Sequence, residues 1–237
     1  MSLSRVESVQ TPDGPFDLTV WPPPAAASGP ALLLIQEIFG VSDYITAVAE
    51  DLAGLGYVVG APDLFWRFKP GHKAGHDEAG LNESLALVSR FDVAQGVADA
   101  AAALAHLRSL PEADDRAGVV GFCLGGNIAY FLAAQAELDA AVSFYGSGVP
   151  GSLEVLDQIS APLQFHFGGS DPYIPRDQVA AVEQASAGRG NVEIHVEEEA
   201  GHAFHNRKAP MFYVPEPAAR AWLRTEDFLR RHLPVRS

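Results

Sequence analysis

The sequence contains little cysteine, few cations and no long hydrophobic run. Only one of the 237 residues is a cysteine, which excludes an intramolecular disulfide and a cysteine-based zinc site. The formal net charge of −14 argues against nucleic acid or an anionic membrane as a partner. The longest apolar stretches are too short to cross a bilayer. We expect a cytoplasmic protein, because the N-terminal "MSLSRVESVQ" has no apolar signal segment.

The composition is that of a folded globular chain. Hydrophobic residues make up 48% of the sequence and charged residues 19%, values that are typical of a packed core and unlike those of disordered proteins. There is no internal repeat and no low-complexity linker. We therefore predict a single domain over residues 1–237.

Apolar runs alternate with segments of helical periodicity. The alternation predicts a doubly wound, mostly parallel sheet, and the first two strands are candidates for an antiparallel edge. Residues 67–80 form the only long irregular stretch, which we expect to be a loop beside the site. The expected strands are 16–23, 31–36, 56–63, 117–122, 140–146, 162–169 and 192–198. The expected helices are 43–55, 81–91, 93–109, 124–136, 175–187 and 216–232.

The single thiol stands at a strand-to-helix switch. Gly121, Cys123 and Gly125 form the pattern G-x-C-x-G, a nucleophile elbow with cysteine in place of serine. The N–H of Leu124 would then point at the same spot as the sulfur and could hold a developing oxyanion. A buried, inert thiol and a redox-sensing thiol are alternatives. The position between glycines favours the nucleophile.

An elbow nucleophile needs an acid and a histidine later in the chain, in that order. Asp171 follows the predicted strand 162–169, and His202 follows the predicted strand 192–198. These positions predict a Cys123–His202–Asp171 triad at the carboxyl ends of neighbouring strands. His205 competes for the role of His202, whereas His166 lies within an apolar strand and is expected to be a core histidine.

Other features of the sequence do not predict a metal or cofactor site. His72 and His76 are four residues apart, but the glycines around them argue against a preformed metal site. We therefore expect neither a metal nor a cofactor. We expect the chain to be a monomer or a weak homo-oligomer.

The segment "QEIFG" follows the second predicted strand. In α/β-hydrolases the loop at this place supplies the second oxyanion donor, and the N–H of Ile38 is the candidate. Glu37 is less expected there, because a carboxylate repels an oxyanion. We interpret Glu37 as a group that handles the proton of the resting thiol and moves aside when substrate binds. The alternative is a solvated acid at a strand end.

Six motifs together resemble the dienelactone hydrolase family, the carboxymethylenebutenolidases. They are "QEIFGV" (36–41), "GYVVGAPDLF" (56–65), "GFCLGG" (121–126), "FYG" (144–146), "GGSDPYIP" (168–175) and "EEAGHAF" (198–204). The resemblance implies an α/β-hydrolase fold with about eight strands and no cap domain. It also implies that Cys123, His202 and Asp171 form the triad and that Glu37 governs ionisation of the thiol.

The resemblance carries over less well to the substrate. Founding members of the family hydrolyse dienelactone, a cyclic enol ester, and hold its carboxylate with two arginines. Arg207 falls where one of these is expected, but Leu81 stands at the place of the other. The same predicted helix has Leu85 and Val88 where founding members have aromatic residues. Arg67 and Lys69 are candidates for a substitute cation.

The sequence thus predicts a hydrolase that cleaves a lactone or an activated ester through a cysteine acyl-enzyme. We expect Arg207, Tyr145, Phe39 and Phe204 to contact the small-molecule substrate. A broad carboxylesterase or thioesterase is the main alternative, because the second arginine is missing. A non-catalytic homologue that binds a small molecule is a further alternative, which the complete triad disfavours.

Overall fold

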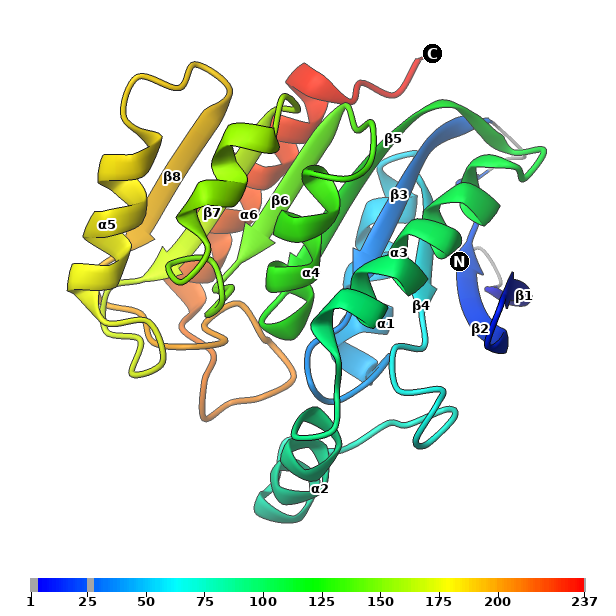
Figure 1. Cartoon of the computed structure of the whole chain (residues 1–237), viewed down its shortest axis with the longest axis horizontal. Helices are drawn as coiled ribbons and strands as arrows, with labels where there is room; N and C mark the ends of the chain where they lie inside the picture. The colour runs from blue at the N-terminus through cyan, green and yellow to red at the C-terminus, as the bar shows by residue number, and fades with distance from the viewer. Residues whose placement is uncertain (1–3, 25–27, 237) are drawn as a thin grey trace.

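One eight-stranded sheet runs through the molecule (Figure 1). The computed structural model describes residues 4–24 and 28–236. The strands are β1 (Arg5–Thr11), β2 (Gly14–Trp21), β3 (Gly29–Ile35), β4 (Val58–Pro62), β5 (Ala113–Phe122), β6 (Ala140–Phe144), β7 (Leu163–Gly168) and β8 (Val192–Glu197). The helices are α1 (Asp43–Gly54), α2 (Glu78–Val88), α3 (Val93–Arg108), α4 (Leu124–Ala133), the 3₁₀ helix η2 (Leu153–Gln158), α5 (Arg176–Ser186) and α6 (Pro215–His232).

The strand order is β1-β2-β4-β3-β5-β6-β7-β8. The β1–β2 and β2–β4 pairs are antiparallel, and every pair from β4–β3 onward is parallel. The predicted parallel sheet is confirmed, but the prediction that β3 belongs to an antiparallel edge is wrong. All seven residues of β3 are buried, and a wholly apolar strand is stable only between neighbours.

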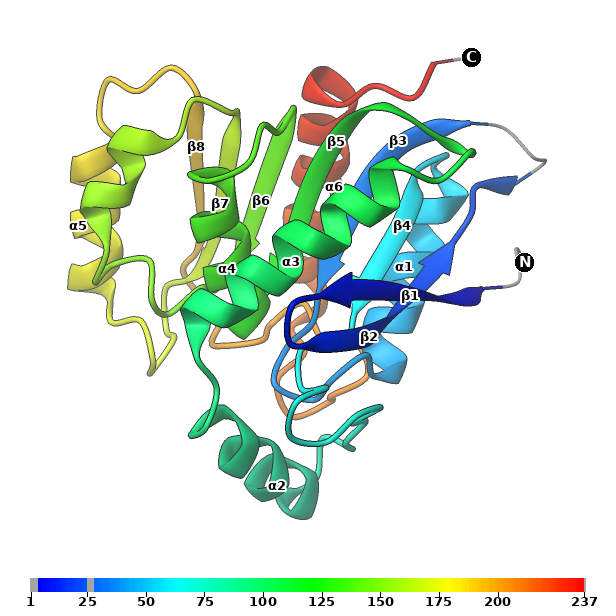
Figure 2. The ribbon, with the colours of Figure 1, turned by 45° about the vertical axis from the view of Figure 1, so that its right-hand side comes forward.

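The outermost strand, β1, is absent from the predicted elements. Its side chains alternate between exposed and partly buried, and only one is fully buried. It pairs with β2 at the rim of the molecule (Figure 2). A polar edge strand of this kind has no apolar run to reveal it in the sequence.

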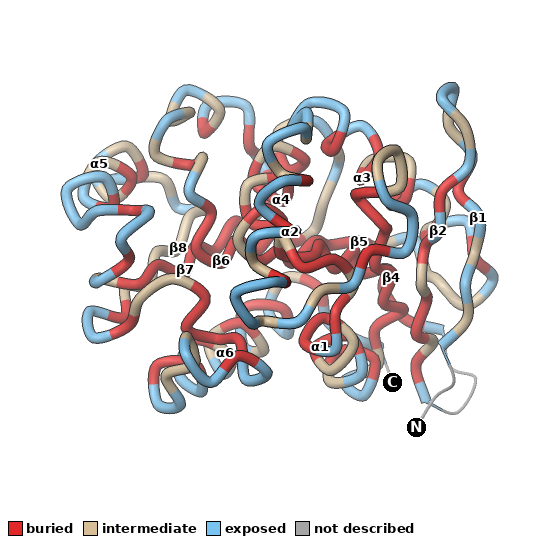
Figure 3. The backbone as a smooth tube through the Cα atoms, turned by 90° about the horizontal axis from the view of Figure 1, so that it is seen from below, coloured by how far each residue is buried: buried red, intermediate tan, exposed pale blue. Residues whose placement is uncertain are grey.

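Helices cover both faces of the sheet. The view from below places α3, α4 and α5 on one face and α1 and α6 on the other, with buried strands between them (Figure 3). Every residue of β4, β6 and β7 is buried. Burial on two faces explains why these strands appear in the sequence as unbroken apolar runs.

The parallel strands end at the same edge of the sheet, and α2 lies beyond that edge (Figure 1). The helix begins at Glu78 because the side chain of Asp77 accepts a hydrogen bond from the N–H of Gly80 at 2.8 Å and caps it. It therefore starts and ends three residues earlier than predicted. The irregular segment before it packs beside the site, since Lys73 forms a β-bridge with Gly40.

No helix in residues 4–24 and 28–236 combines the length and the apolar character that crossing a bilayer needs.

Candidate active site

A strained turn between β5 and α4 holds the thiol at the carboxyl edge of the sheet. Cys123 has φ 55° and ψ −112°, a backbone conformation that costs on the order of 1–3 kcal/mol in a non-glycine residue. A Cβ on Gly121 would overlap the carbonyl oxygen of Gly125, and a Cβ on Gly125 would overlap the carbonyl oxygen of Ile35. Both glycines are thus required by the close approach of strand and helix.

The structure brings Cys123, His202 and Asp171 together. Nε2 of His202 lies 3.1 Å from Sγ of Cys123, and Nδ1 lies 2.7 Å from Oδ2 of Asp171. The other carboxylate oxygen, Oδ1, accepts the N–H of Tyr173 at 2.8 Å. The Asp171 side chain is fully buried. These contacts fix the imidazole between the sulfur and the carboxylate in a hydrogen-bonding geometry suited to proton transfer.

The pKa of His202 reflects this position. Burial alone lowers it, but the electrostatic interaction with Cys123 and the hydrogen bond to Asp171 outweigh burial and raise it to about 10. A raised pKa favours the doubly protonated ring, which in this paired arrangement can donate to both the carboxylate and the sulfur.

We expect the His202 ring to titrate near pH 10 in the wild-type protein and at lower pH in Cys123→Ser, which loses the electrostatic interaction with the sulfur. Imidazole NMR measures both midpoints. The folded pKa of His202 lies above the ordinary value of 6.5. The stabilisation that protonation of His202 contributes is therefore complete below about pH 6.5 and is lost as the pH rises through 10. An unchanged midpoint in Cys123→Ser would contradict the assignment. His205 is the internal control, because burial lowers its pKa to about 3.

Two backbone amides are available next to the sulfur. Within the described residues, the N–H groups of Leu124 and Ile38 donate to no other protein group. Leu124 is the first residue of α4, and Ile38 lines the same pocket as Cys123. Free N–H groups at such positions can stabilise an oxyanion.

Glu37 is almost completely buried, with 1% of its side chain exposed. The hydroxyl of Tyr145 donates to Oε1 at 3.3 Å, and Nδ2 of Asn206 donates to Oε2 at 2.8 Å. Burial raises the pKa of Tyr145 well above its usual value, so its hydroxyl remains a donor. Nε2 of His76 lies 2.9 Å from Nδ2 of Asn206. In this arrangement the thiol is paired with His202, and Glu37 is held by Tyr145 and Asn206.

The sequence reasoning missed Asn206 and His76 as neighbours of Glu37. Neither residue belongs to a pattern that indicates such a role. The sequence offers one indication for Asn206: it lies four residues after His202. A residue so near the predicted triad in the chain is expected to lie near it in the fold.

A cavity of about 270 Å³ opens beside the sulfur. Phe39, which the sequence analysis expects to contact the substrate, lines this cavity. Tyr145 and Phe204 do not: both are fully buried and pack against each other, with ring centroids 5.6 Å apart. The full lining consists of Glu37, Ile38, Phe39, Leu81, Leu85, Cys123, Ser147, Tyr173, His202, Ala203 and Phe212.

Comparison with known proteins assigns the chain to a family. The model of the Dienelactone hydrolase family matches residues 16–233. A carboxymethylenebutenolidase from Pseudomonas putida is 34% identical over 223 residues, which cover 94% of each chain. The chain belongs to the dienelactone hydrolase family.

Solved structures show the same fold. A protein assigned as a dienelactone hydrolase from Klebsiella pneumoniae subsp. pneumoniae MGH 78578 superposes with a TM-score of 0.83 at 29% identity, covering 97% of this chain and 98% of that chain. An esterase from Pyrococcus furiosus, with a TM-score of 0.73 and 17% identity over 98% of this chain and 93% of that chain, shares the fold. The predicted α/β-hydrolase fold is confirmed, and the chain is a hydrolase of the dienelactone hydrolase family.

The cations expected at the substrate do not line the cavity of this dienelactone hydrolase family member. Arg207 pairs with Asp51 of α1 at 2.6 Å and donates to the carbonyl of Ala47. The two candidates for a substitute cation are also paired: Lys69 with Glu83, and Arg67 with Asp99. Each of these three cations is therefore paired with a carboxylate outside the cavity.

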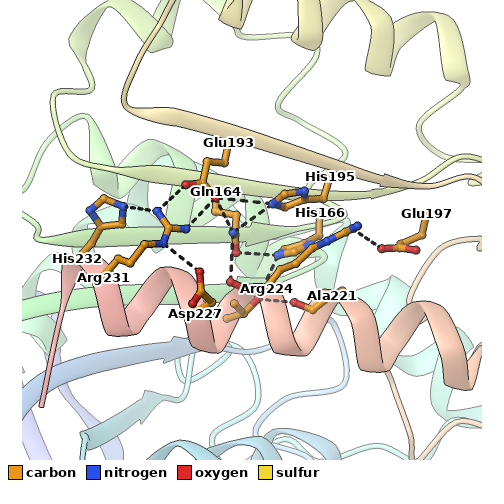
Figure 4. A network of polar contacts seen from close by, with 11 residues as sticks. Gln164, His166, Glu193, His195, Glu197, Ala221, Arg224, Asp227, Arg231 and His232 are labelled. Atoms are coloured by element: carbon orange, nitrogen blue, oxygen red, sulfur yellow. Dashed lines mark hydrogen bonds and ion pairs between the residues drawn. The ribbon is translucent and has the colours of Figure 1, made fainter.

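Two further histidines, His205 and His166, are buried away from the cavity. His205 is buried with Nδ1 at 2.7 Å from the Tyr44 hydroxyl. His166 is a core histidine, as predicted: its Nε2 lies 2.9 Å from Oε1 of Gln164 and 3.1 Å from the Thr225 hydroxyl. Figure 4 shows it in a polar network between β7, β8 and α6. Among residues 4–24 and 28–236, no three His, Cys, Asp or Glu side chains cluster as metal ligands.

Proposed function

We propose that this chain hydrolyses carboxylic esters and lactones through a thioester on Cys123. The observation that carries the proposal is the row of sulfur, imidazole and carboxylate, with contacts of 3.1 and 2.7 Å, at the wall of a cavity. The Pseudomonas putida relative is a carboxymethylenebutenolidase, and a butenolide is an unsaturated lactone, which supports the inclusion of lactones.

In the first step the sulfur of Cys123 forms a bond to the substrate's carbonyl carbon. The carbonyl oxygen takes up the negative charge, which the N–H groups of Ile38 and Leu124 stabilise. The carbonyl then re-forms as the bond to the leaving oxygen breaks. The imidazolium of His202 gives its Nε2 proton to that oxygen, and Asp171 keeps the ring oriented.

In the second step the neutral His202 takes a proton from a water molecule as the water oxygen attacks the thioester. The intermediate expels the sulfur as a thiolate, releases the carboxylic acid and leaves His202 protonated again. A thiolate is itself expelled easily, so the mechanism suits enolate or phenolate leaving groups and disfavours amides, whose nitrogen leaves poorly.

Glu37 has a separate role in the proposal. We assign to it the transfer of the thiol proton when the sulfur is not yet paired with His202. To act in this way the carboxylate must leave the hydrogen bonds from Tyr145 or Asn206, which hold it in place while Cys123 is paired with His202.

Trapping the thioester tests the function directly. After mixing with 4-nitrophenyl acetate and quenching in acid, mass spectrometry should find one acetyl group on the Cys123 peptide and none in Cys123→Ala. Ester turnover without this adduct, undiminished in Cys123→Ala, would refute the proposal. In the same experiment Glu37→Gln should slow acetylation by about 10²-fold and leave deacetylation unchanged. An unchanged acetylation rate would remove Glu37 from the mechanism without affecting the role of Cys123.

A further inference from the structure

The walls of the cavity beside Cys123 are mostly apolar. The apolar lining residues are Ile38, Phe39, Leu81, Leu85, Ala203 and Phe212. These residues come from the loop after β3, from α2 and from the segment after β8. An apolar wall favours a substrate group that gains free energy by leaving water.

Within the part of the chain that the structure describes, no Lys or Arg side chain lines this cavity, and Glu37 is the only carboxylate that does. Arg207 is paired with Asp51, Lys69 with Glu83, and the chain as a whole carries a formal charge of −14. A carboxylate on the substrate would therefore lose its hydration in this cavity without gaining a cationic partner. It would also be repelled by Glu37 and by the net negative charge of the protein.

Two large side chains at the cavity are unusually exposed. Leu85 of α2 is 50% exposed and Tyr173, which follows Asp171, is 66% exposed. Both line the cavity that contains the sulfur. Met211, next to the lining residue Phe212, is also 66% exposed. Leu85 and Tyr173 thus expose apolar surface at the same cavity, which a bound ligand would cover.

We propose that the physiological substrate is an ester or lactone whose acyl portion is uncharged and apolar, and that Leu85 and Tyr173 select it. This inference rests on the proposed function. The apolar part of the substrate lies along Leu81, Leu85 and Phe212 while its carbonyl carbon faces Sγ. Neutral esters are then favoured over the carboxylate-bearing lactones that founding members of the family hydrolyse.

A pair of esters with the same leaving group tests the inference. 4-Nitrophenyl butyrate is uncharged, and mono-4-nitrophenyl succinate carries a carboxylate at the end of an acyl chain of similar length. We expect kcat/KM to favour the butyrate by on the order of 100-fold, because the carboxylate is desolvated without a partner. An equal value for the two esters, or a preference for the succinate, would overturn the proposal.

Placing a cation at the opening should weaken the preference. Leu85→Arg should lower the butyrate-to-succinate ratio by at least about tenfold. Leu223→Arg is the matched control, since Leu223 is a 65% exposed leucine on α6, and it should leave the ratio unchanged. Both sites are exposed, so both variants should fold, which circular dichroism checks. Equal ratios in the two variants would remove Leu85 from substrate selection.

The same series separates the two proposals. In Cys123→Ala, loss of turnover for both esters supports the thioester mechanism whichever ester the wild-type protein prefers. If the wild type prefers the succinate and that activity depends on Cys123, the substrate inference fails and the mechanism stands. If Cys123→Ala keeps wild-type turnover, the mechanism fails, and with it the inference that depends on it.

Discussion

Replacing Cys123 with alanine is expected to lower kcat/KM for 4-nitrophenyl esters by about 10⁴-fold or more. Among residues 4–24 and 28–236, the sulfur is the only nucleophile within hydrogen-bonding distance of His202, at 3.1 Å from Nε2. Without it, the amides of Ile38 and Leu124 can still stabilise an oxyanion, so a small residual rate from attack by water should persist. Steady-state kinetics across a range of ester concentrations measures the loss.

Cys123→Ser is the matched control for this experiment. Serine keeps a polar atom at the same strained position, where φ is 55°, so the alanine and serine variants share any cost in stability. The serine hydroxyl is far less acidic than a thiol, and we expect its activity to stay within about 10² of the alanine variant. A serine variant as active as the wild type would show that the reaction does not require a thiolate.

Replacing Gly121 with alanine is expected to lower the free energy of unfolding by more than about 3 kcal/mol. Its Cβ would overlap the carbonyl oxygen of Gly125. The obstructing atoms are backbone of the first turn of α4, so no side chain can rotate away to make room. The turn must open, which moves Sγ away from His202. Urea denaturation measures the loss of stability, and ester turnover should fall with it.

Gly54→Ala is the control for this substitution. Gly54 ends α1, and a Cβ there would have no heavy atom within 4 Å. Because alanine restricts the unfolded chain more than glycine does, we expect this variant to gain up to about 1 kcal/mol. If Gly121→Ala unfolds at the same urea concentration as Gly54→Ala, the close packing of strand and helix at the turn is not what requires glycine.

The turn around Cys123 could be predicted because its constraint is local. Gly121 is required by the carbonyl of Gly125, four residues away, so the reason for it is visible in a short stretch of sequence. Gly125 is required by the neighbouring strand β3, but it belongs to the same G-x-C-x-G pattern. The positions of Asp171 and His202 could also be predicted from the sequence, because each residue follows an apolar strand and parallel strands end at one edge of the sheet. The order of elements therefore determines where these side chains meet.

The substrate side of the site was harder to predict. Arg207 stands at the expected place in the chain, yet it pairs with Asp51, a residue of α1 far away in the sequence. The carboxylate with which an exposed cation pairs depends on the tertiary fold. A short sequence pattern therefore does not predict the pairing. Tyr145 was expected at the substrate, but its ring is fully buried and its hydroxyl donates to Glu37.

The attachment of α2 has a consequence for how this enzyme can evolve. The helix lies beyond the edge of the sheet (Figure 1), and its buried residues are only Gly80, Ser84 and Leu87, while Leu81 and Leu85 line the cavity. Changes at those two positions alter what the cavity accepts and leave the packed interior untouched. Substitutions at these two positions can therefore change which substrates the enzyme accepts with little loss of stability. The strands that position the reacting groups need not change.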